Sequence, residues 1–317
     1  MKLVFLFTTL LIFQSVLAQK KQRVLFYNVE NLFDTIKGLN DDSEYLPSSK
    51  KEWNSAKYLE KLTHIRQVLN DAGRPIVAGF CEVENEGVVR DIIKNQKNFE
   101  NYGLVHYESE DKRGIDVAMI YDSSKLKLAA KGILRFRFDD DTAARTRDIL
   151  WANYNFKKHN FYVIVNHWPS RTGGVEKTEA RRLKAAQTAF YFVDSLLAID
   201  STTRIIFMGD LNDHPNDIAP QLMSLKLQPM ISSSSGKMGG THYYDKKWDV
   251  LDHIMVSSGA LKAKKLKVTA NSGIIHEFPY LLKDVKGTKY PFRTYHSGKY
   301  QAGYSDHLPV SVEISIP

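Results

Sequence analysis

Acidic, amide and imidazole side chains stand at the ends of several short apolar runs in this sequence. Each run has the composition of a buried strand, so its polar end is expected on the rim of a sheet, where ligand sites gather in open α/β folds. One such residue is most often an ordinary turn or cap residue. Together they predict one crowded acidic pocket, and its members are Asn28, Glu82, Asn166, His167, Asp210, Asn212, Asp252, Asp306 and His307.

The residue types in this set indicate the chemistry. Carboxylates and amides, with few histidines and a single cysteine, favour a hard cation such as Mg²⁺, Mn²⁺ or Ca²⁺. A catalytic zinc site usually has several histidines at helical spacing, and the sequence has no HExxH motif. His167 and His307 suggest acid–imidazole pairs. A metal, a histidine pair and amide donors suit attack by water on a phosphate ester. The absence of GxxxxGK[ST] and GxSxG motifs weakens the kinase and esterase interpretations.

Apolar runs and segments with helical spacing predict the strands and helices that position these residues. Helical spacing over Tyr58–Asn70 puts Leu59, Leu62 and Ile65 on one face, and a longer helix is expected over Val175–Leu197. Strands among helices favour layered α/β architecture in a single domain. The expected strands are Val24–Tyr27, Ile76–Phe80, Ile115–Tyr121, Phe161–Val165, Arg204–Met208, Val250–Val256 and Leu308–Ile316. Loops are expected over Gly38–Lys51, Asp139–Arg147, Ser232–Lys247 and Asn271–Gly303.

The amino terminus and the composition indicate an exported basic protein. Residues 1–18 combine an early lysine, a short apolar run and small residues at a cleavage site, which predicts a signal peptide followed by one domain over 19–317. A retained amino-terminal anchor is the alternative. The chain of 317 residues carries a net charge of +8, and its only cysteine, Cys81, excludes an internal disulfide framework. We expect a monomer in the periplasm or outside the cell.

Two motifs, Gly209-Asp210-Leu211-Asn212 and Tyr304–Pro309 (YSDHLP), are the most specific. With the shorter motifs around them, from Asn28 to Pro309, the chain resembles the endonuclease/exonuclease/phosphatase superfamily, the deoxyribonuclease I-like hydrolases. The resemblance implies a four-layer α/β sandwich, in which two mixed β-sheets pack face to face with helices on the outer faces.

The resemblance also implies a metal site. Glu82 matches the principal metal carboxylate of the family, with Asn28 beside it and Asp306 adding to the site. Glu30 stands where some relatives carry an acid near the metal. The implied cofactor is Mg²⁺ or Mn²⁺, with Ca²⁺ as a further option.

Five residues match the family's catalytic groups. Asp210 matches the acid that orients or deprotonates the attacking water, and Asn212 the amide that holds a phosphate oxygen. His307 matches an imidazole paired with Asp252, and His167 the imidazole that contacts the scissile phosphate. Which group is the base stays open.

Other candidates come from the residue types. Arg113, Arg171 and Arg293 are predicted to bind phosphate through bidentate contacts. Asp116 is the candidate acid partner of His167. The segment Phe278–Leu282 is the candidate membrane-facing loop of a lipid enzyme.

Three functions compete. A secreted metal-dependent nuclease acting on DNA or RNA is favoured by the basic charge and by the stretch Lys262–Lys267, because phosphate neutralisation dominates nucleic-acid affinity. The alternative is a phosphatase of sugar or inositol phosphates, or a sphingomyelinase-like phosphodiesterase acting on phospholipid. A binding module that has lost catalysis is the third option, which the complete set of acids and imidazoles disfavours.

Overall fold

Two large β-sheets form the centre of the molecule. The computed structural model describes residues 20–316, so the predicted signal peptide lies outside the described residues. The first sheet comprises β1 (Lys20–Leu32), β2 (Val77–Val83), β3 (Tyr102–His106), β4 (Asp116–Asp122), β13 (Lys267–Val268), β14 (Ile274–Ile275) and β19 (Val310–Ile316). The second comprises β5 (Lys127–Leu134), β6 (Ile149–Phe156), β7 (His159–His167), β8 (Ile205–Asp210), β9 (Gln228–Pro229) and β12 (Asp252–Val256).

Both sheets are mixed. In the first, with order β13-β19-β1-β2-β4-β3, the β1–β2 pair is parallel, and in the second, with order β5-β6-β7-β8-β12-β9, the β7–β8 pair is parallel. The two sheets meet face to face, and Gly79 of β2 marks a close approach. A Cβ added there would lie 2.6 Å from Met208 Cε and 2.8 Å from Val165 Cγ2 on the facing sheet. Any larger residue at this position would require the Met208 and Val165 side chains to shift.

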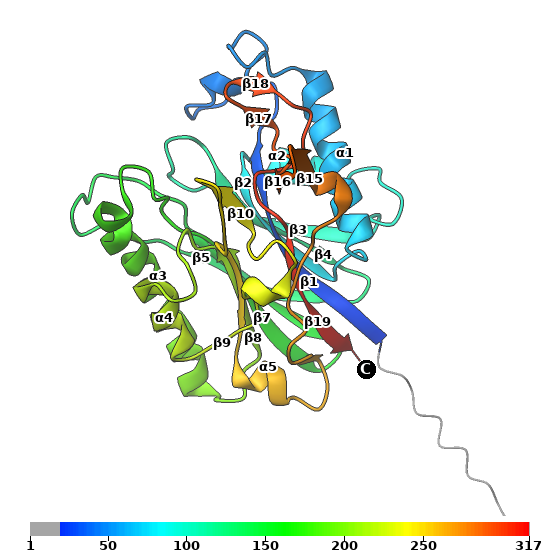
Figure 1. Ribbon diagram of the computed structural model, residues 1–317. Helices are drawn as coiled ribbons and strands as arrows, with labels where there is room; N and C mark the ends of the chain where they lie inside the picture. The colour runs from blue at the N-terminus through cyan, green and yellow to red at the C-terminus, as the bar shows by residue number, and fades with distance from the viewer. Residues whose placement is uncertain (1–19, 317) are drawn as a thin grey trace, which may run out of the picture.

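Helices cover the outer faces of the two sheets. In Figure 1, α1 (Ser55–Asp71) and α2 (Glu86–Ile93) lie on one side of the sandwich, and α3 (Val175–Ile199) and α4 (Ile218–Ser224) on the other. The α3 helix buries Ala185, Ala186, Ala189 and Val193 against the second sheet. The short α5 (Ser258–Lys262) follows β12. These layers confirm the predicted four-layer α/β sandwich.

The predicted helices and strands are found, with local differences. The Asn54 side chain caps α1 by accepting from Lys57 N. Leu59, expected on the buried face of α1, is instead 57% exposed, and Lys61 is buried. Strands β3, β5 and β6 were not expected, and β5 is mostly exposed, which obscures its alternation. None of the helices in the described part of the chain is long and apolar enough to cross a membrane.

The segment Asn271–Gly303, predicted as a loop, contains regular structure. Besides β14, it forms two antiparallel hairpins. They are β15 (Leu282–Val285) with β16 (Thr288–Pro291), and β17 (Tyr295–His296) with β18 (Lys299–Tyr300). The predicted loop Ser232–Lys247 likewise holds β10 (His242–Tyr244), which pairs with β11 (Lys247–Asp249). Short 3₁₀ turns occur at Ser43–Tyr45, Ser233–Ser235 and Pro279–Leu281.

Candidate active site

Strand register places the predicted site residues at one end of the sandwich. The parallel pairing of β7 with β8 sets His167 beside Asp210, and the antiparallel pairing of β12 with β8 sets Asp252 on the other side of Asp210. In the first sheet, Asn28 pairs with Cys81, so Glu82 follows directly. The two sheets are joined at this end by Asn28 Nδ2, which donates to Asp210 Oδ2 across 3.0 Å.

Left-handed backbone conformations occur at several of these strand ends. Glu82 has φ 62°, Glu30 has φ 51° and Asn212 has φ 50°. The register of β2 also shifts between Cys81 and Val83, as at a β-bulge. Such conformations cost free energy and re-aim side chains, and they occur often at functional sites. Here they mark the points where the strands turn polar groups toward the rim.

The Asn28 side-chain amide points its nitrogen toward the acids. Asn28 Nδ2 lies 3.4 Å from Glu82 Oε1, while Asn28 Oδ1 accepts from Glu30 N across 3.0 Å. The other Glu82 oxygen accepts from Asn31 N. In this orientation Asn28 donates to both Glu82 and Asp210, and its role as a metal ligand stays a prediction.

His307 joins two buried carboxylates. Its Nδ1 lies 2.7 Å from Asp252 Oδ2 and its Nε2 lies 3.7 Å from Asp210 Oδ2. Burial opposes the charged imidazole, yet the Asp252 and Asp210 carboxylates raise the pKa of His307 well above its usual value. Burial raises the pKa of Asp210. The predicted Asp252–His307 pair is thus present, and it faces the predicted water-activating acid.

His167 lies on the opposite side of Asp210. Its Nε2 is 3.9 Å from both Asp210 Oδ2 and Glu82 Oε1, and its Nδ1 has no hydrogen-bond partner among the described residues. Burial, with the charges of Arg147 and Arg113, lowers the pKa of His167 well below its usual value. The ring is therefore neutral at physiological pH.

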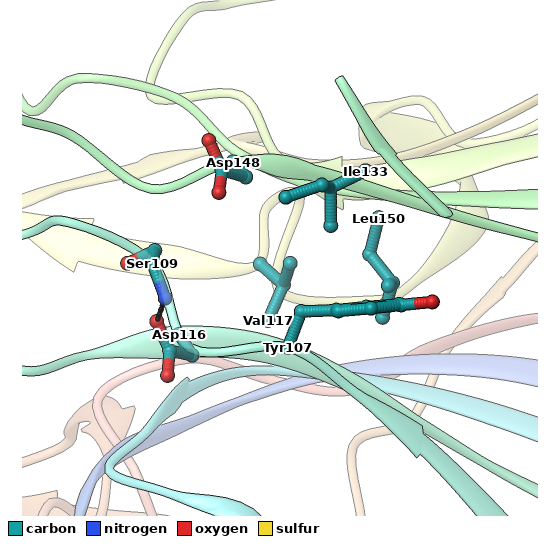
Figure 2. A pocket seen from close by; sticks show the side chains of 7 residues that line it. All are labelled: Tyr107, Ser109, Asp116, Val117, Ile133, Asp148 and Leu150. Atoms are coloured by element: carbon teal, nitrogen blue, oxygen red, sulfur yellow. Dashed lines mark hydrogen bonds between the residues drawn. The ribbon is translucent and has the colours of Figure 1, made fainter. Parts of the chain in front are cut away.

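The predicted pairing of Asp116 with His167 is wrong. Asp116 Oδ2 lies 2.9 Å from His106 Nε2, and Asp116 Oδ1 accepts from Ser109 N, also at 2.9 Å. Figure 2 shows Asp116 beside Ser109 in a tightly packed pocket that holds neither catalytic histidine. Asp116 starts β4, whose partner β3 supplies His106, so strand pairing commits this acid to another histidine.

Arg171 holds the loop that carries Asn212. Its Nε donates to the Asn212 backbone oxygen across 2.7 Å, and its Nη2 donates to Asp217 Oδ2, also across 2.7 Å. The Asn212 side chain donates to Trp168 O, which also accepts from Arg147. Because the Arg171 guanidinium is committed to this loop, its predicted phosphate-binding role finds no support in the geometry.

Arg293 lies between two acids. It donates to Glu30 Oε1 across 3.2 Å and to Asp306 Oδ2 across 2.8 Å. Arg293 therefore orients the predicted metal acid Asp306 and retains partial exposure. Arg113 is different, because its side chain is 55% exposed and its one ion pair among the described residues is with Asp111, at 3.6 Å.

Sequence reasoning missed two residues at this end of the sandwich. Lys61 is buried on α1 and donates to Thr294 Oγ1 and to Tyr304 O, each at 2.5 Å. It thereby ties α1 to the segments that carry Arg293 and Asp306. His242 on β10 lies against His307, with ring centroids 4.7 Å apart and the rings tilted by 37°. A helical lysine and a histidine in a predicted loop gave no sequence signal.

The donor set fits a hard divalent cation. Glu82 and Asp306 side chains are 17% and 21% exposed, whereas those of Asp210 and Asp252 are 3% and 1% exposed. An ion from solvent would meet the first two, and carboxylate oxygens are ligands that Mg²⁺, Mn²⁺ and Ca²⁺ prefer.

Comparison with known proteins agrees with this geometry. The sequence matches the profile of the Endonuclease/Exonuclease/phosphatase family over residues 23–316. No curated protein sequence matches significantly.

Solved structures share the fold. A mannosyl-6-phosphatase from Bacteroides thetaiotaomicron superposes with a TM-score of 0.59 at 15% identity, covering 93% of this chain and 100% of that one. The human Nocturnin catalytic domain with bound sulfate gives 0.58 at 16% identity, covering 94% and 95%. Truncated TDP2 from Caenorhabditis elegans gives 0.58 at 12% identity, covering 93% and 99%.

The profile match over most of the chain, on a sandwich whose strand ends gather these acids and imidazoles, shows that the chain belongs to the endonuclease/exonuclease/phosphatase family and is a phosphoric ester hydrolase.

Proposed function

We propose that the chain is a Mg²⁺- or Mn²⁺-dependent nuclease that hydrolyses phosphodiester bonds of DNA or RNA. The observation that carries the proposal is a basic cavity near His167. It has a volume of about 310 Å³ and is lined by Lys112, Arg113 and Arg145, with two aspartates. Asp111 of this cavity accepts from Arg147, which also donates to the backbone oxygen of Trp168, the residue after His167, so the cavity lies near the acidic centre. Phosphates flanking the cleaved bond would be held here.

The acids with access to solvent would hold the ion. Glu82 would be the main ligand, with Asp306 beside it. A bound divalent cation supplies charge that stabilises the phosphoryl and leaving oxygens. Arg293 sets the orientation of Asp306, and Asn28 sets that of Glu82.

The chain's own groups would activate water and hold the phosphate. Asp210 orients the water and accepts its proton, while His307, charged and fixed by Asp252, faces Asp210 and stabilises the negative charge that develops. Neutral His167 and the Asn212 amide donate hydrogen bonds to phosphoryl oxygens. Because these donors are fixed by the strands and by Trp168 O, little reorganisation is needed.

A second candidate is hydrolysis of small sugar phosphates. A cavity of about 110 Å³ beside Glu30 and Arg293 is lined by Tyr45, Lys51 and Tyr295. Two tyrosines and two cations suit a polar ring rather than an extended strand. One protein of the same fold is a mannosyl-6-phosphatase. For a lipid substrate there is less support, because the predicted membrane loop Phe278–Leu282 packs against the core, with Leu281 1% exposed.

Export remains part of the proposal. It is supported by the residue pattern of positions 1–18, and appearance of a shortened chain outside the cytoplasm would test it.

Assays with plasmid DNA and with hexose phosphates test the nuclease proposal against the second candidate. Nicking of supercoiled plasmid should require Mg²⁺ and should fall steeply between 50 and 200 mM salt, as counterion release predicts. Replacing Arg113 by Gln should weaken plasmid cleavage and make its salt dependence shallower. Lys264→Gln is the matched control, because the basic stretch Lys262–Lys267 begins at the last residue of α5, at the other end of β8 from the site. The stretch therefore lends no support to nucleic-acid binding at the site, contrary to the expectation from the sequence. Rapid hydrolysis of hexose phosphates without nicking would instead establish the second candidate.

A further inference from the structure

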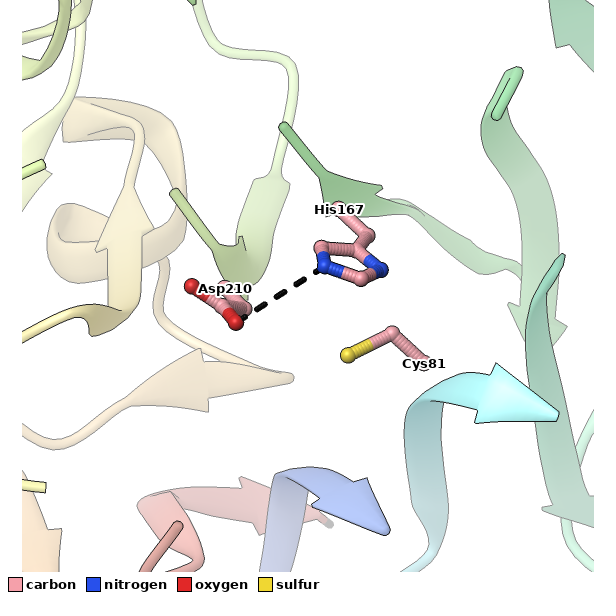
Figure 3. Close-up of side chains that lie close together, drawn as sticks. All are labelled: Cys81, His167 and Asp210. Carbon is pink, nitrogen blue, oxygen red and sulfur yellow. Dashed lines mark ion pairs between the residues drawn. The ribbon is translucent and has the colours of Figure 1, made fainter. Parts of the chain in front are cut away.

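Cys81 lies in the floor of the site and has no part in the proposed hydrolysis. Its Sγ, a ring nitrogen of His167 and a carboxylate oxygen of Asp210 all lie within 4.8 Å of one another. Figure 3 shows the sulfur below the imidazole, with His167 and Asp210 facing each other above it. These three residues come from three different strands, β2, β7 and β8, so the fold itself brings them together.

His167 supplies an independent sign of a ligand. It is buried, with only 6% of its surface exposed, and Nε2, the ring nitrogen that faces Asp210, makes no hydrogen bond among the described residues. Its Nε2 approaches Asp210 and Glu82 only at 3.9 Å, beyond hydrogen-bond distance. A buried imidazole without such partners costs free energy. A cation between Nε2 and the two carboxylates would give this nitrogen a partner.

We propose that Cys81, His167 and Asp210 form a binding site for a thiophilic divalent cation such as Zn²⁺, with Glu82 as the fourth ligand. Thiolate, imidazole and carboxylate are the ligands of tetrahedral zinc, whereas Mg²⁺ avoids sulfur. Zinc bond lengths of about 2.0–2.3 Å put neighbouring ligand atoms roughly 3.3–3.8 Å apart. The ligand atoms of Cys81, His167 and Asp210 now lie within 4.8 Å of one another, so they would need to close by at most roughly 1–1.5 Å.

Zinc binding would change one bond at Cys81. An uncoordinated cysteine thiol is ordinarily protonated at neutral pH. Coordination breaks the S–H bond, forms the Zn–S bond and releases the proton to solvent. No oxidant or reductant takes part.

Zinc in this site would arrest hydrolysis. Asp210 and His167 would both be coordinated, so neither would be free to handle water or phosphate. This consequence rests on the proposed hydrolysis, but binding itself does not. The site would thus make the enzyme sensitive to the ratio of zinc to magnesium.

Cobalt spectroscopy tests the site without using activity. The chain has one cysteine, so a sulfur-to-cobalt charge-transfer band on titration of the purified full chain with Co²⁺ can arise only from Cys81. Zn²⁺ should abolish the band by displacement. Cys81→Ser should lack it and should bind Zn²⁺ at least about tenfold more weakly in calorimetry. Co²⁺ or Zn²⁺ binding without a band, or with equal affinity in Cys81→Ser, would overturn the proposal.

Control variants establish that the cobalt band arises at this site in a folded protein. His106→Gln alters the separate group His106, Glu108 and Asp116, and it should keep the band; loss of the band in this variant would overturn the assignment. Near-ultraviolet circular dichroism checks that Cys81→Ser is folded. Should that variant unfold, His167→Gln serves instead, and it should lose affinity by a similar factor; unchanged affinity would overturn the site.

An activity assay tests the inhibitory consequence. The Zn²⁺ concentration that halves Mg²⁺-supported hydrolysis should be about tenfold lower for the wild type than for Cys81→Ser. Without zinc, the two proteins should hydrolyse substrate at the same rate. A cobalt band without this difference would keep the site and overturn the inhibition. Absence of any hydrolysis would contradict the proposed function alone, because the band is read without substrate.

Discussion

Asp252 accepts a hydrogen bond from His307 Nδ1 across 2.7 Å, and this contact directs the other ring nitrogen toward Asp210. The Asp252 side chain is 1% exposed and its second oxygen has no partner among the described residues. A buried carboxylate of this kind stabilises a charged imidazole strongly. The pair therefore fixes both the orientation and the charge of His307.

Replacing Asp252 by Asn should lower kcat by about 10²–10⁴-fold, because the shape is retained while the charge that supports the imidazolium is lost. KM should change much less. Steady-state kinetics on the best substrate would measure both. Asp200→Asn, an exposed position at a distant turn, is the control and should behave as wild type. A kcat for Asp252→Asn within a few-fold of wild type would remove this pair from the mechanism.

Arg171 should act through the position of Asn212. In Arg171→Gln the contact to the Asn212 backbone is lost, and a displacement on the order of 1 Å is expected to cost about 10²-fold in kcat. Arg181→Gln is the matched control, because Arg181 makes its ion pair with Asp140 on the surface. Equal rates for the two variants would show that the loop is held without Arg171.

Much of the fold was readable from the sequence because buried strands differ in composition from their ends. Each predicted run became a strand of one of the two sheets, and the polar residues in the carboxyl-terminal parts of β1, β2, β7 and β8 lie at one rim. The edge strand β5 was not predicted because its side chains are largely exposed and the sequence shows no alternation of apolar and polar residues there.

Partnerships between side chains were less predictable. Asp116 was matched to the wrong histidine, because the choice depends on the β3–β4 pairing rather than on sequence distance. Leu59, expected on the buried face of α1, is exposed. Lys61 is buried on the same helix because the Tyr304 oxygen and Thr294 Oγ1 accept hydrogen bonds from its amine. The hairpins after β14 depend on tertiary contacts. Arg171 donates hydrogen bonds to the loop that carries Asn212, and the sequence alone does not show where that loop lies.

His276 makes stability depend on pH. Burial, aided by the charge of Arg23, lowers the pKa of His276 to about 4. In the unfolded chain this histidine takes up its proton near pH 6.5. The contribution of the neutral ring to the unfolding free energy is therefore fully present above that pH and is lost as the pH falls toward 4.

This loss should amount to about 2 kcal/mol between pH 7 and pH 5. Urea unfolding of the wild type and of His276→Gln across this range measures it, because other titrating groups cancel in the difference. A difference in unfolding free energy that stays constant with pH would contradict the assignment.

The central claim, metal-dependent hydrolysis centred on Asp210, is tested most directly by the initial rate on a chromogenic phosphodiester. Wild type and Asp210→Asn are compared with Mg²⁺ before and after addition of EDTA, with melting temperatures to confirm folding. We predict a wild-type rate that EDTA abolishes and that Asp210→Asn lowers by at least about 10³-fold. A wild-type rate that survives EDTA, or an Asp210→Asn rate close to wild type, would contradict the account.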